Sequence, residues 1–134
     1  MELVIASTAL AAMIAHAAAA MPNEACGVLV ARVVAVDAAV PAANVAATPR
    51  TCFEIDPATL LATHRAARTA GLRIAGWYHS HPNGRAEPSA TDAARAVPDG
   101  RVWMIVAGGT VAAWRAVTGG AVHDRFDPLI LVAA

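Results

Sequence analysis

Residues able to bind a metal ion lie close together in one short segment of the chain. His79 and His81 stand two positions apart before a loop, and Asp92 follows that loop. Residues two apart on a β-strand point to the same face, with α-carbons about 6.6–6.8 Å apart, so we expect both imidazoles to face one volume. Asp92 falls in the first turn of a helix predicted to begin at Ser89, so its carboxylate can turn back toward the strand. Two histidines and one carboxylate leave a fourth tetrahedral position open, which is typical of a catalytic zinc site.

Two further residues could complete a hydrolytic site. Zinc lowers the pKa of a bound water to about 7, but a base that is not itself a ligand must still move the proton. Glu24 stands at the start of an apolar strand, so we expect its carboxylate at the edge of the sheet. The Ser89 hydroxyl could donate to the oxyanion that forms when water attacks a carbonyl. Losing one such donor typically costs on the order of 2.7–4 kcal/mol of barrier.

Together these residues form a pattern that resembles the JAMM (or MPN-plus) family of zinc metallopeptidases, in particular its bacterial single-domain members. The family pattern is Glu, a long gap, His-(Ser/Thr)-His, seven residues, Ser, two residues and Asp. The chain matches it with Glu24, His79-Ser80-His81, Pro82–Pro88, Ser89 and Asp92. The flanking Gly76-Trp77-Tyr78 and Glu24–Leu29 also resemble the family, and the likeness runs from about Glu2 to Val117.

The resemblance implies a fold, a cofactor and a division of roles. The implied fold class is α/β, a sandwich related to cytidine deaminases in which helices flank a curved mixed β-sheet. Zn2+ would be held by His79, His81 and Asp92. Glu24 would act as the general base and acid, and Ser89 would stabilise the tetrahedral intermediate.

The resemblance also implies a substrate, which is the expected partner. Family members hydrolyse peptide or isopeptide bonds at the C-terminal diglycine of ubiquitin-like proteins, and prokaryotic members act on small ubiquitin-like sulfur carriers. The extended tail would pair with a sheet edge, where main-chain hydrogen bonds supply affinity. The stretch between Val36 and Pro49 leaves little room for the insertion with which ubiquitin-specific members grip their substrate. We therefore expect a carrier protein rather than a ubiquitin chain.

Simpler interpretations of the same residues remain open. Ser89-Ala90-Thr91-Asp92 is close to a helix capping box, and a glutamate at a strand start, such as Glu24, is more often a surface carboxylate. A non-catalytic scaffold of the same fold would bind a ubiquitin-like partner without cleaving it, and a general metallopeptidase would cleave short peptides. The sequence motifs of zinc deaminases and of the His-Glu-x-x-His proteases are absent.

The composition restricts the class of protein. The chain has 134 residues, which fits a single domain over residues 1–134. Its 10 basic residues, all arginine, balance 10 acidic residues, which argues against nucleic-acid binding through a strong basic field. Cys26 and Cys52 form no C-x-x-C pair and predict buried, reduced thiols, as in a cytoplasmic protein. A homodimer is compatible with the sequence.

The apolar segment from Val4 to Met21 imitates a targeting signal or a membrane span. It contains no arginine, whereas a signal peptide begins with positive charge. It is rich in weakly apolar alanine, whereas a span needs about 20 strongly apolar residues. We therefore expect no membrane segment here, but a strand over Glu2–Ala6 and then a helix capped by Ser7 or Thr8.

Apolar patterning and turn residues predict the remaining elements. We expect strands over Cys26–Ala35, Val36–Pro49 (edge-like), Thr51–Ile55 (half-buried), Leu72–His81, Arg101–Ala107 and Val111–Val117. The first helix should end at Pro22, the second should run from Asp56-Pro57 to Gly71, and the third should cover Ser89–Val97. Gly108-Gly109 predicts a hairpin turn, and Gly119-Gly120 precedes a last strand or a tail. Strands interleaved with helices predict an α/β or α+β fold.

Overall fold

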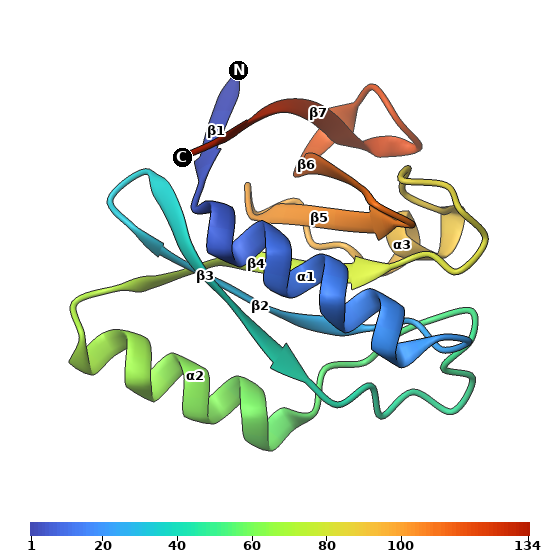
Figure 1. The fold of residues 1–134 in the computed structure, drawn as a ribbon. Coiled ribbons are helices and arrows are strands. Elements are labelled where there is room, and N and C mark those ends of the chain that lie inside the picture. Colours follow the sequence, from blue (N-terminus) through green and yellow to red (C-terminus); the bar gives the residue numbers. More distant parts are fainter.

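The computed structural model describes residues 1–134, which form one mixed β-sheet with three helices (Figure 1). The elements are β1 (Glu2–Ile5), α1 (Ser7–Ala20), β2 (Cys26–Arg32), β3 (Ala35–Ala42), α2 (Pro57–Thr69), β4 (Arg73–Ser80), α3 (Ala90–Arg95), β5 (Val102–Ala107), β6 (Thr110–Gly120) and β7 (Asp124–Ala133). The strand order is β1-β3-β2-β4-β5-β6-β7, and the sheet closes into a barrel. The expected curved mixed sheet with helices is confirmed, and the implied relation to cytidine deaminases stays a prediction.

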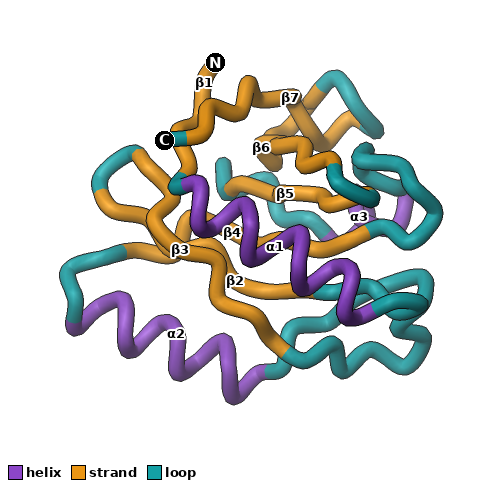
Figure 2. The backbone as a smooth tube through the Cα atoms, viewed as in Figure 1, coloured by secondary structure: helices purple, strands orange, loops and turns teal.

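Helices cover both faces of the sheet (Figures 1 and 2). α1 covers one face, where its buried Met13 belongs to the same apolar cluster as Leu29 and Ala31 of β2. Val30, which lies between those two residues of β2, lines a groove with α2 on the opposite face. Ala96, which follows α3, packs in a second apolar cluster with Trp103 of β5 and Trp114 of β6. None of these helices is both long and apolar enough to cross a membrane.

Successive side chains along β4 point to opposite faces of the sheet. Tyr78 faces α1, and its hydroxyl oxygen lies 2.7 Å from Nδ1 of His16. Gly27 leaves room for the Tyr78 ring, because a Cβ at position 27 would lie 2.2 Å from Tyr78 Cε1. His79, the next residue, points to the opposite layer and packs beside Trp103. The period of two along this strand therefore places one histidine of the motif among aromatic side chains.

The sheet closes through a short seam at β1. This strand pairs in parallel with β7 over its full length, but with β3 only through Val4 and Ile5. The backbone N–H and the hydroxyl of Ser7 both donate to the carbonyl oxygen of Ala134, which ties the end of β7 to the start of α1. From Ala38 onward β3 pairs with β2 alone, so this part of the strand keeps an unpaired edge, as expected.

The expected strand boundaries around β3 are wrong. The strand expected to run from Cys26 to Ala35 ends at Arg32, because Val33 has a φ of 53° and turns the chain. The strand expected over Val36–Pro49 is β3, which ends at Ala42. Thr51–Ile55 is not a strand, and only an isolated bridge pairs Ile55 with Asn44. Asn44 donates from Nδ2 to the carbonyl oxygen of Cys52 and accepts the backbone N–H of Glu54 at Oδ1, so its side chain takes the place of a regular ladder in this segment.

The expected helix caps are partly wrong. α1 has Ala6 at its N-cap, without any side-chain cap, so neither Ser7 nor Thr8 caps the helix. α2 begins at Pro57 as expected, but the Asp56 side chain accepts from the Thr59 hydroxyl and caps no backbone N–H. Gly71 follows the end of α2 with a φ of 72°, the left-handed conformation expected of a glycine there. The last strand, left open by the sequence, is β7.

Gly76 generates a prediction about the contact between β4 and β5. A Cβ at this position would lie 1.8 Å from the carbonyl oxygen of Val102. We expect Gly76→Ala to lower the free energy of unfolding by about 3 kcal/mol, because the two strand backbones must move apart. Urea unfolding measures this change. Gly109→Ala is the control, since nothing lies within 4 Å of its Cβ, and it should change stability by less than about 1 kcal/mol. Wild-type stability in Gly76→Ala would contradict the close approach.

Candidate metal centre

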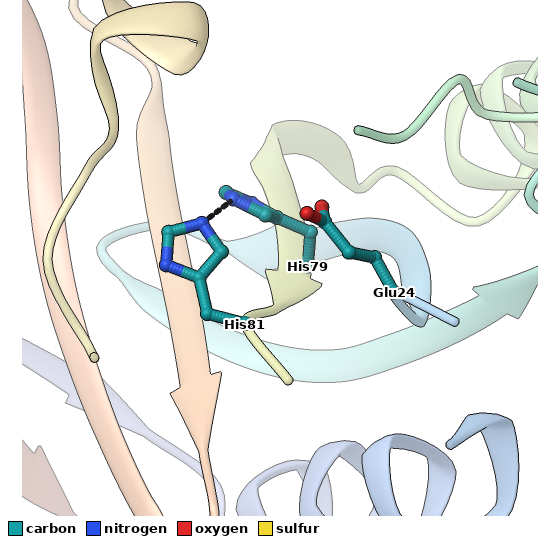
Figure 3. Close-up of side chains that lie close together, drawn as sticks. All are labelled: Glu24, His79 and His81. Carbon is teal, nitrogen blue, oxygen red and sulfur yellow. Dashed lines mark hydrogen bonds between the residues drawn. The ribbon is translucent and has the colours of Figure 1, made fainter. Parts of the chain in front are cut away.

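Three buried side chains meet where β2 begins and β4 ends. Glu24 lies just before β2, and His79 and His81 lie on and just after β4. Because the two strands are antiparallel and Cys26 pairs with His79, Glu24 is brought beside the two histidines. One ligand atom from each of the three lies within 4.8 Å of the other two. Figure 3 shows the three side chains converging from the start of β2 and the end of β4.

Asp92 completes a compact triangle of donor atoms with the two histidines. Nε2 of His79 lies 2.9 Å from Nε2 of His81, and Oδ2 of Asp92 lies 3.1 Å from each nitrogen. Ligand atoms at 2.0–2.1 Å from a tetrahedral zinc ion are about 3.3 Å apart. The triangle therefore has nearly the size that a zinc ion requires, and two imidazoles with one carboxylate are chemically suitable ligands. The donor set fits the group that the resemblance implies.

The start of α3 fixes the position of the Asp92 carboxylate. The Asp92 backbone N–H donates to Ser89 Oγ (3.0 Å), and the Ser89 backbone N–H donates to Asp92 Oδ2 (2.9 Å). These two bonds form the capping box that the sequence suggested. The same Oδ2 atom faces both histidines. The capping interpretation and the metal interpretation are thus compatible, because the cap aims the carboxylate at the imidazoles.

His81 is oriented by the loop that follows it. Its Nδ1 lies 2.8 Å from the carbonyl oxygen of Arg85, which can only accept, so Nδ1 carries the proton and Nε2 keeps its lone pair. This is the arrangement in which a histidine ligates a metal through Nε2. The loop is itself held in place, since the Trp114 indole donates to the carbonyl oxygen of Ala86 (3.2 Å). A residue of β6 thereby supports the ring of a histidine on β4.

His79 is held by packing instead. The ring of Phe53 stacks on it with centroids 4.4 Å apart and planes at 19°, and Trp103 meets it edge-on at 5.8 Å. Its buried Nδ1 has no hydrogen-bond partner. Arg95 of α3 donates to the carbonyl oxygen of Phe53 (2.9 Å) and holds the stacked segment against the sheet. The sequence reasoning missed this role of Phe53, because it assigned the residue to a strand distant from the motif.

Burial changes the proton affinity of Glu24. Removal from solvent is the largest effect, and it raises the pKa of the Glu24 carboxyl to about 7. The nearby His81 opposes this rise, and the Asp92 carboxylate adds to it. Its Oε1 atom is buried without a hydrogen-bond partner. Glu24 also lines a small cavity of about 160 Å³ together with His81 and Ser89. A carboxyl group in this state can both accept and release a proton near neutral pH.

The pKa values of the three triangle residues shift in ways that follow from their contacts. Burial lowers the pKa of His79, and the neighbouring Asp92 carboxylate only partly offsets it. For His81 burial also acts downward, but the Asp92 and Arg85 hydrogen bonds outweigh it and raise the pKa. Burial would raise the pKa of Asp92, yet the contacts with both histidines and with the Ser89 backbone N–H hold it well below its usual range. Asp92 is therefore a permanent anion in this site.

Two polar side chains hold the peptide unit that joins Glu24 to Ala25. Ser80, the middle residue of the His-Ser-His motif, accepts the backbone N–H of Ala25 at its Oγ (2.7 Å). Asn44 Nδ2 donates to the carbonyl oxygens of Glu24 (3.0 Å) and Cys52 (3.1 Å). Neither role was expected. A hydroxyl on a buried strand was the available signal for Ser80, whereas nothing in the sequence links Asn44 to Glu24.

The cysteines are free and take no part in the triangle. Cys26 is buried, as expected, and burial together with the nearby Glu24 carboxylate raises the pKa of its thiol to about 12. Cys52 is only half-buried. A thiol that stays protonated at neutral pH is a poor nucleophile and a poor metal ligand. Cys26 is therefore part of the packing beneath the site.

Comparison with known proteins identifies the family. The sequence pattern of the prokaryotic homologs of the JAB domain matches residues 6–117. A desampylase from Haloferax volcanii is 45% identical over 86 residues, which cover 63% of this chain and 62% of the relative. A probable TtuB-protein conjugate cleaving protease from Thermus thermophilus is 40% identical over 57 residues, which cover 42% of this chain and 38% of the relative. The matches thus span less than two thirds of either relative.

Solved structures agree with this fold. A protein from Desulfitobacterium hafniense has a TM-score of 0.83 at 26% identity, with 98% of this chain and 92% of that chain covered. A protein from Salinibacter ruber has a TM-score of 0.71 at 30% identity, with 100% and 92% covered. A JAB1/MPN domain protein from Archaeoglobus fulgidus, 17% identical, shares the fold with a TM-score of 0.62 and 98% of both chains covered. The chain belongs to the prokaryotic branch of the JAB (JAMM/MPN) family, which confirms the resemblance.

The hydrogen bond between Ser80 and Ala25 generates a prediction. Ser80→Ala leaves the buried N–H of Ala25 without its side-chain acceptor, and such a loss costs about 1–3 kcal/mol of stability. Denaturant unfolding measures the change. Thr118→Ala, which alters an exposed side chain without a hydrogen bond of its own, should stay within about 0.5 kcal/mol of the wild type. If the two variants were equally stable, the bond would not secure the strand that carries Glu24.

Proposed function

We propose that the chain is a zinc-dependent hydrolase that cleaves a peptide or isopeptide bond at the C-terminal tail of a small ubiquitin-like or sulfur-carrier protein. The observation that carries this proposal is the triangle of two imidazole nitrogens and one carboxylate oxygen beside the buried, partnerless carboxyl oxygen of Glu24. The names of the two relatives, a desampylase and a probable protease for TtuB conjugates, support the same class of substrate.

In this proposal His79, His81 and Asp92 hold the zinc ion. When bound, zinc supplies a Lewis acid and lowers the pKa of a coordinated water toward neutrality. The Arg85 carbonyl keeps the proton of His81 on Nδ1, and the capping box keeps Asp92 ionised and directed at both rings. These contacts fix the orientation of the ligand side chains before zinc binds, so little reorganisation accompanies binding.

Glu24 moves the proton. Its pKa of about 7 allows the carboxylate to accept a proton from the attacking water at Oε1 and to deliver it to the leaving amine. The cavity of about 160 Å³ between Glu24, His81 and Ser89 has room for that water. Because Oε1 has no partner within the protein, no hydrogen bond must be broken before this step.

Ser89 stabilises the negative charge that develops on the substrate carbonyl. Its Oγ accepts the N–H of Asp92, so the hydroxyl proton remains free to donate into the cavity that Ser89 shares with Glu24. A donor fixed in place before the reaction stabilises an oxyanion more than mobile water does. The capping geometry thus gives the hydroxyl a defined direction.

The substrate tail would bind along β3. The strand pairs only with β2 from Ala38 onward and ends at Ala42, opposite Cys26 and close to Glu24. An extended peptide added to this edge would form main-chain hydrogen bonds and reach the candidate site at its end. We place this reaction in the cytoplasm, where the free thiols of Cys26 and Cys52 stay reduced.

The ligand set generates a prediction about metal content. We expect His79→Ala and Asp92→Ala to lose both zinc and hydrolytic activity, because each removes one of three donor atoms and the remaining two hold the ion weakly. Metal analysis of purified protein measures the zinc. His64→Ala alters a histidine of α2 outside the triangle and should keep stoichiometric zinc. Stoichiometric zinc in either ligand variant would contradict the assignment.

The role of Glu24 generates a second prediction. Glu24→Gln should retain zinc while its turnover falls by about 10²–10⁴, because the amide cannot accept the proton. The assay incubates zinc-loaded protein with a carrier protein extended beyond its diglycine and weighs the products. Glu54→Gln, an exposed carboxylate, should retain full activity. Full activity in Glu24→Gln would remove Glu24 from the mechanism.

The same assay separates this enzyme from its alternatives. A carrier-specific enzyme should lose rate when the folded carrier is replaced by its isolated tail peptide, whereas a general metallopeptidase should not. A scaffold of the same fold would bind the carrier and leave it intact, with or without zinc. Cleavage that a chelator abolishes and added zinc restores is the result expected here.

A further inference from the structure

A second cavity lies at the end of the sheet opposite the candidate metal centre. β4 and β5 are parallel, so both strands start at the same end of the sheet. Arg73 begins β4 there, and Arg101 precedes β5. Arg115 of β6 joins them, because it pairs with Val102 in the antiparallel register. All three arginines line one cavity of about 460 Å³. His79 stands six residues beyond Arg73 along β4, or about 20 Å at the strand rise.

Not every arginine at this cavity forms an ion pair with a carboxylate. Two carboxylates also line it, Asp99 and Glu2. Asp99 is engaged with Arg101, whose Nη1 donates to Asp99 Oδ2 at 2.6 Å. Glu2, Arg73 and Arg115 form no ion pair within 4.0 Å. Arg73 and Arg115 are therefore free of direct ion pairs, and the three arginines exceed the two carboxylates at the cavity by one charge.

Backbone carbonyls hold these guanidinium groups in place without neutralising them. Arg73 donates from Nε and Nη2 to the carbonyl oxygen of Val33 (3.3 and 2.9 Å), and Arg115 donates from Nη1 to that of Gly100 (2.7 Å). The buried Nε atoms of Arg101 and Arg115 have no acceptor at all. Arginine side chains that are ordered before binding lose less entropy when they bind a ligand.

We propose that this cavity binds an oxyanion of the phosphate class, either free phosphate or the phosphoryl group of a small organic phosphate. The planar fork of arginine donors matches phosphate oxygens in pairs, and several arginines at one site are typical of phosphate recognition. The cavity has the size of a small-molecule site. Its apolar wall, which includes Leu3, Ile74 and Val102, can contact the organic part of such a ligand. This inference does not depend on the proposed hydrolysis.

Titration of the zinc-loaded full chain with inorganic phosphate and with phenyl phosphate tests the proposal. The readouts are calorimetric affinity and the NMR signals of the Arg101 and Arg115 Nε–H groups. We expect saturable binding that shifts both signals, and affinity weakened by about tenfold or more in Arg73→Gln and in Arg115→Gln. Arg73 is exposed, so its variant keeps the test valid if Arg115→Gln fails to fold. Arg32→Gln, which alters an arginine paired with Asp37 outside the cavity, should bind like the wild type.

The outcomes decide between the possibilities. Tighter binding of phenyl phosphate than of phosphate supports the site with an organic phosphate as its ligand, and equal affinity supports it with free phosphate. Binding that shifts the signals of His79 and His81 and is unchanged in Arg73→Gln would place the anion at the metal and overturn the proposal. Absence of saturation with both probes, each up to about 10 mM, would overturn it as well.

Discussion

A single carboxylate oxygen joins the local folding of α3 to the chemistry of the candidate site. Oδ2 of Asp92 accepts the backbone N–H of Ser89 and lies 3.1 Å from Nε2 of both His79 and His81. A carboxylate buried this deeply is stable only when such partners compensate its charge. The hydrogen bond that begins the helix is thus also the contact that orients the proposed metal ligand Asp92. A change in the backbone at Ser89 would displace both together.

The two histidines of the motif owe their orientation to residues outside β4. The strand fixes only the side from which each ring approaches, and the final ring position depends on contacts that β4 does not supply. His81 takes its position from the Arg85 carbonyl in the following loop, and His79 takes its position from Phe53. Phe53 in turn depends on Arg95 of α3. Contacts among segments far apart in sequence therefore position the donor atoms together.

The sequence was sufficient for several features that depend on local geometry, although it misplaced the N-cap of α1. The spacing of His79 and His81 on a strand, the capping pattern at Ser89 and Asp92, and the apolar runs of β2, β4 and β5 all follow rules of period and turn chemistry, and the structure has these features. Sequence reasoning failed where non-local hydrogen bonds replace regular structure. The segment Thr51–Ile55 alternates like a strand. However, the Asn44 side chain bonds the carbonyl oxygen of Cys52 and the N–H of Glu54, and the segment is irregular. Closure of the sheet was also beyond reach, because no local signal specifies which strands pair across the chain.

The seam at β1 has a consequence for how the chain is made. Ser7 and Ala134, which hydrogen-bond to each other, stand 127 positions apart, and β1 has no complete neighbour until β7 is present. During translation the first strand therefore leaves the ribosome long before its partner exists. Pairings of such large sequence separation form slowly, and an unpaired strand is open to association with other nascent chains in the meantime.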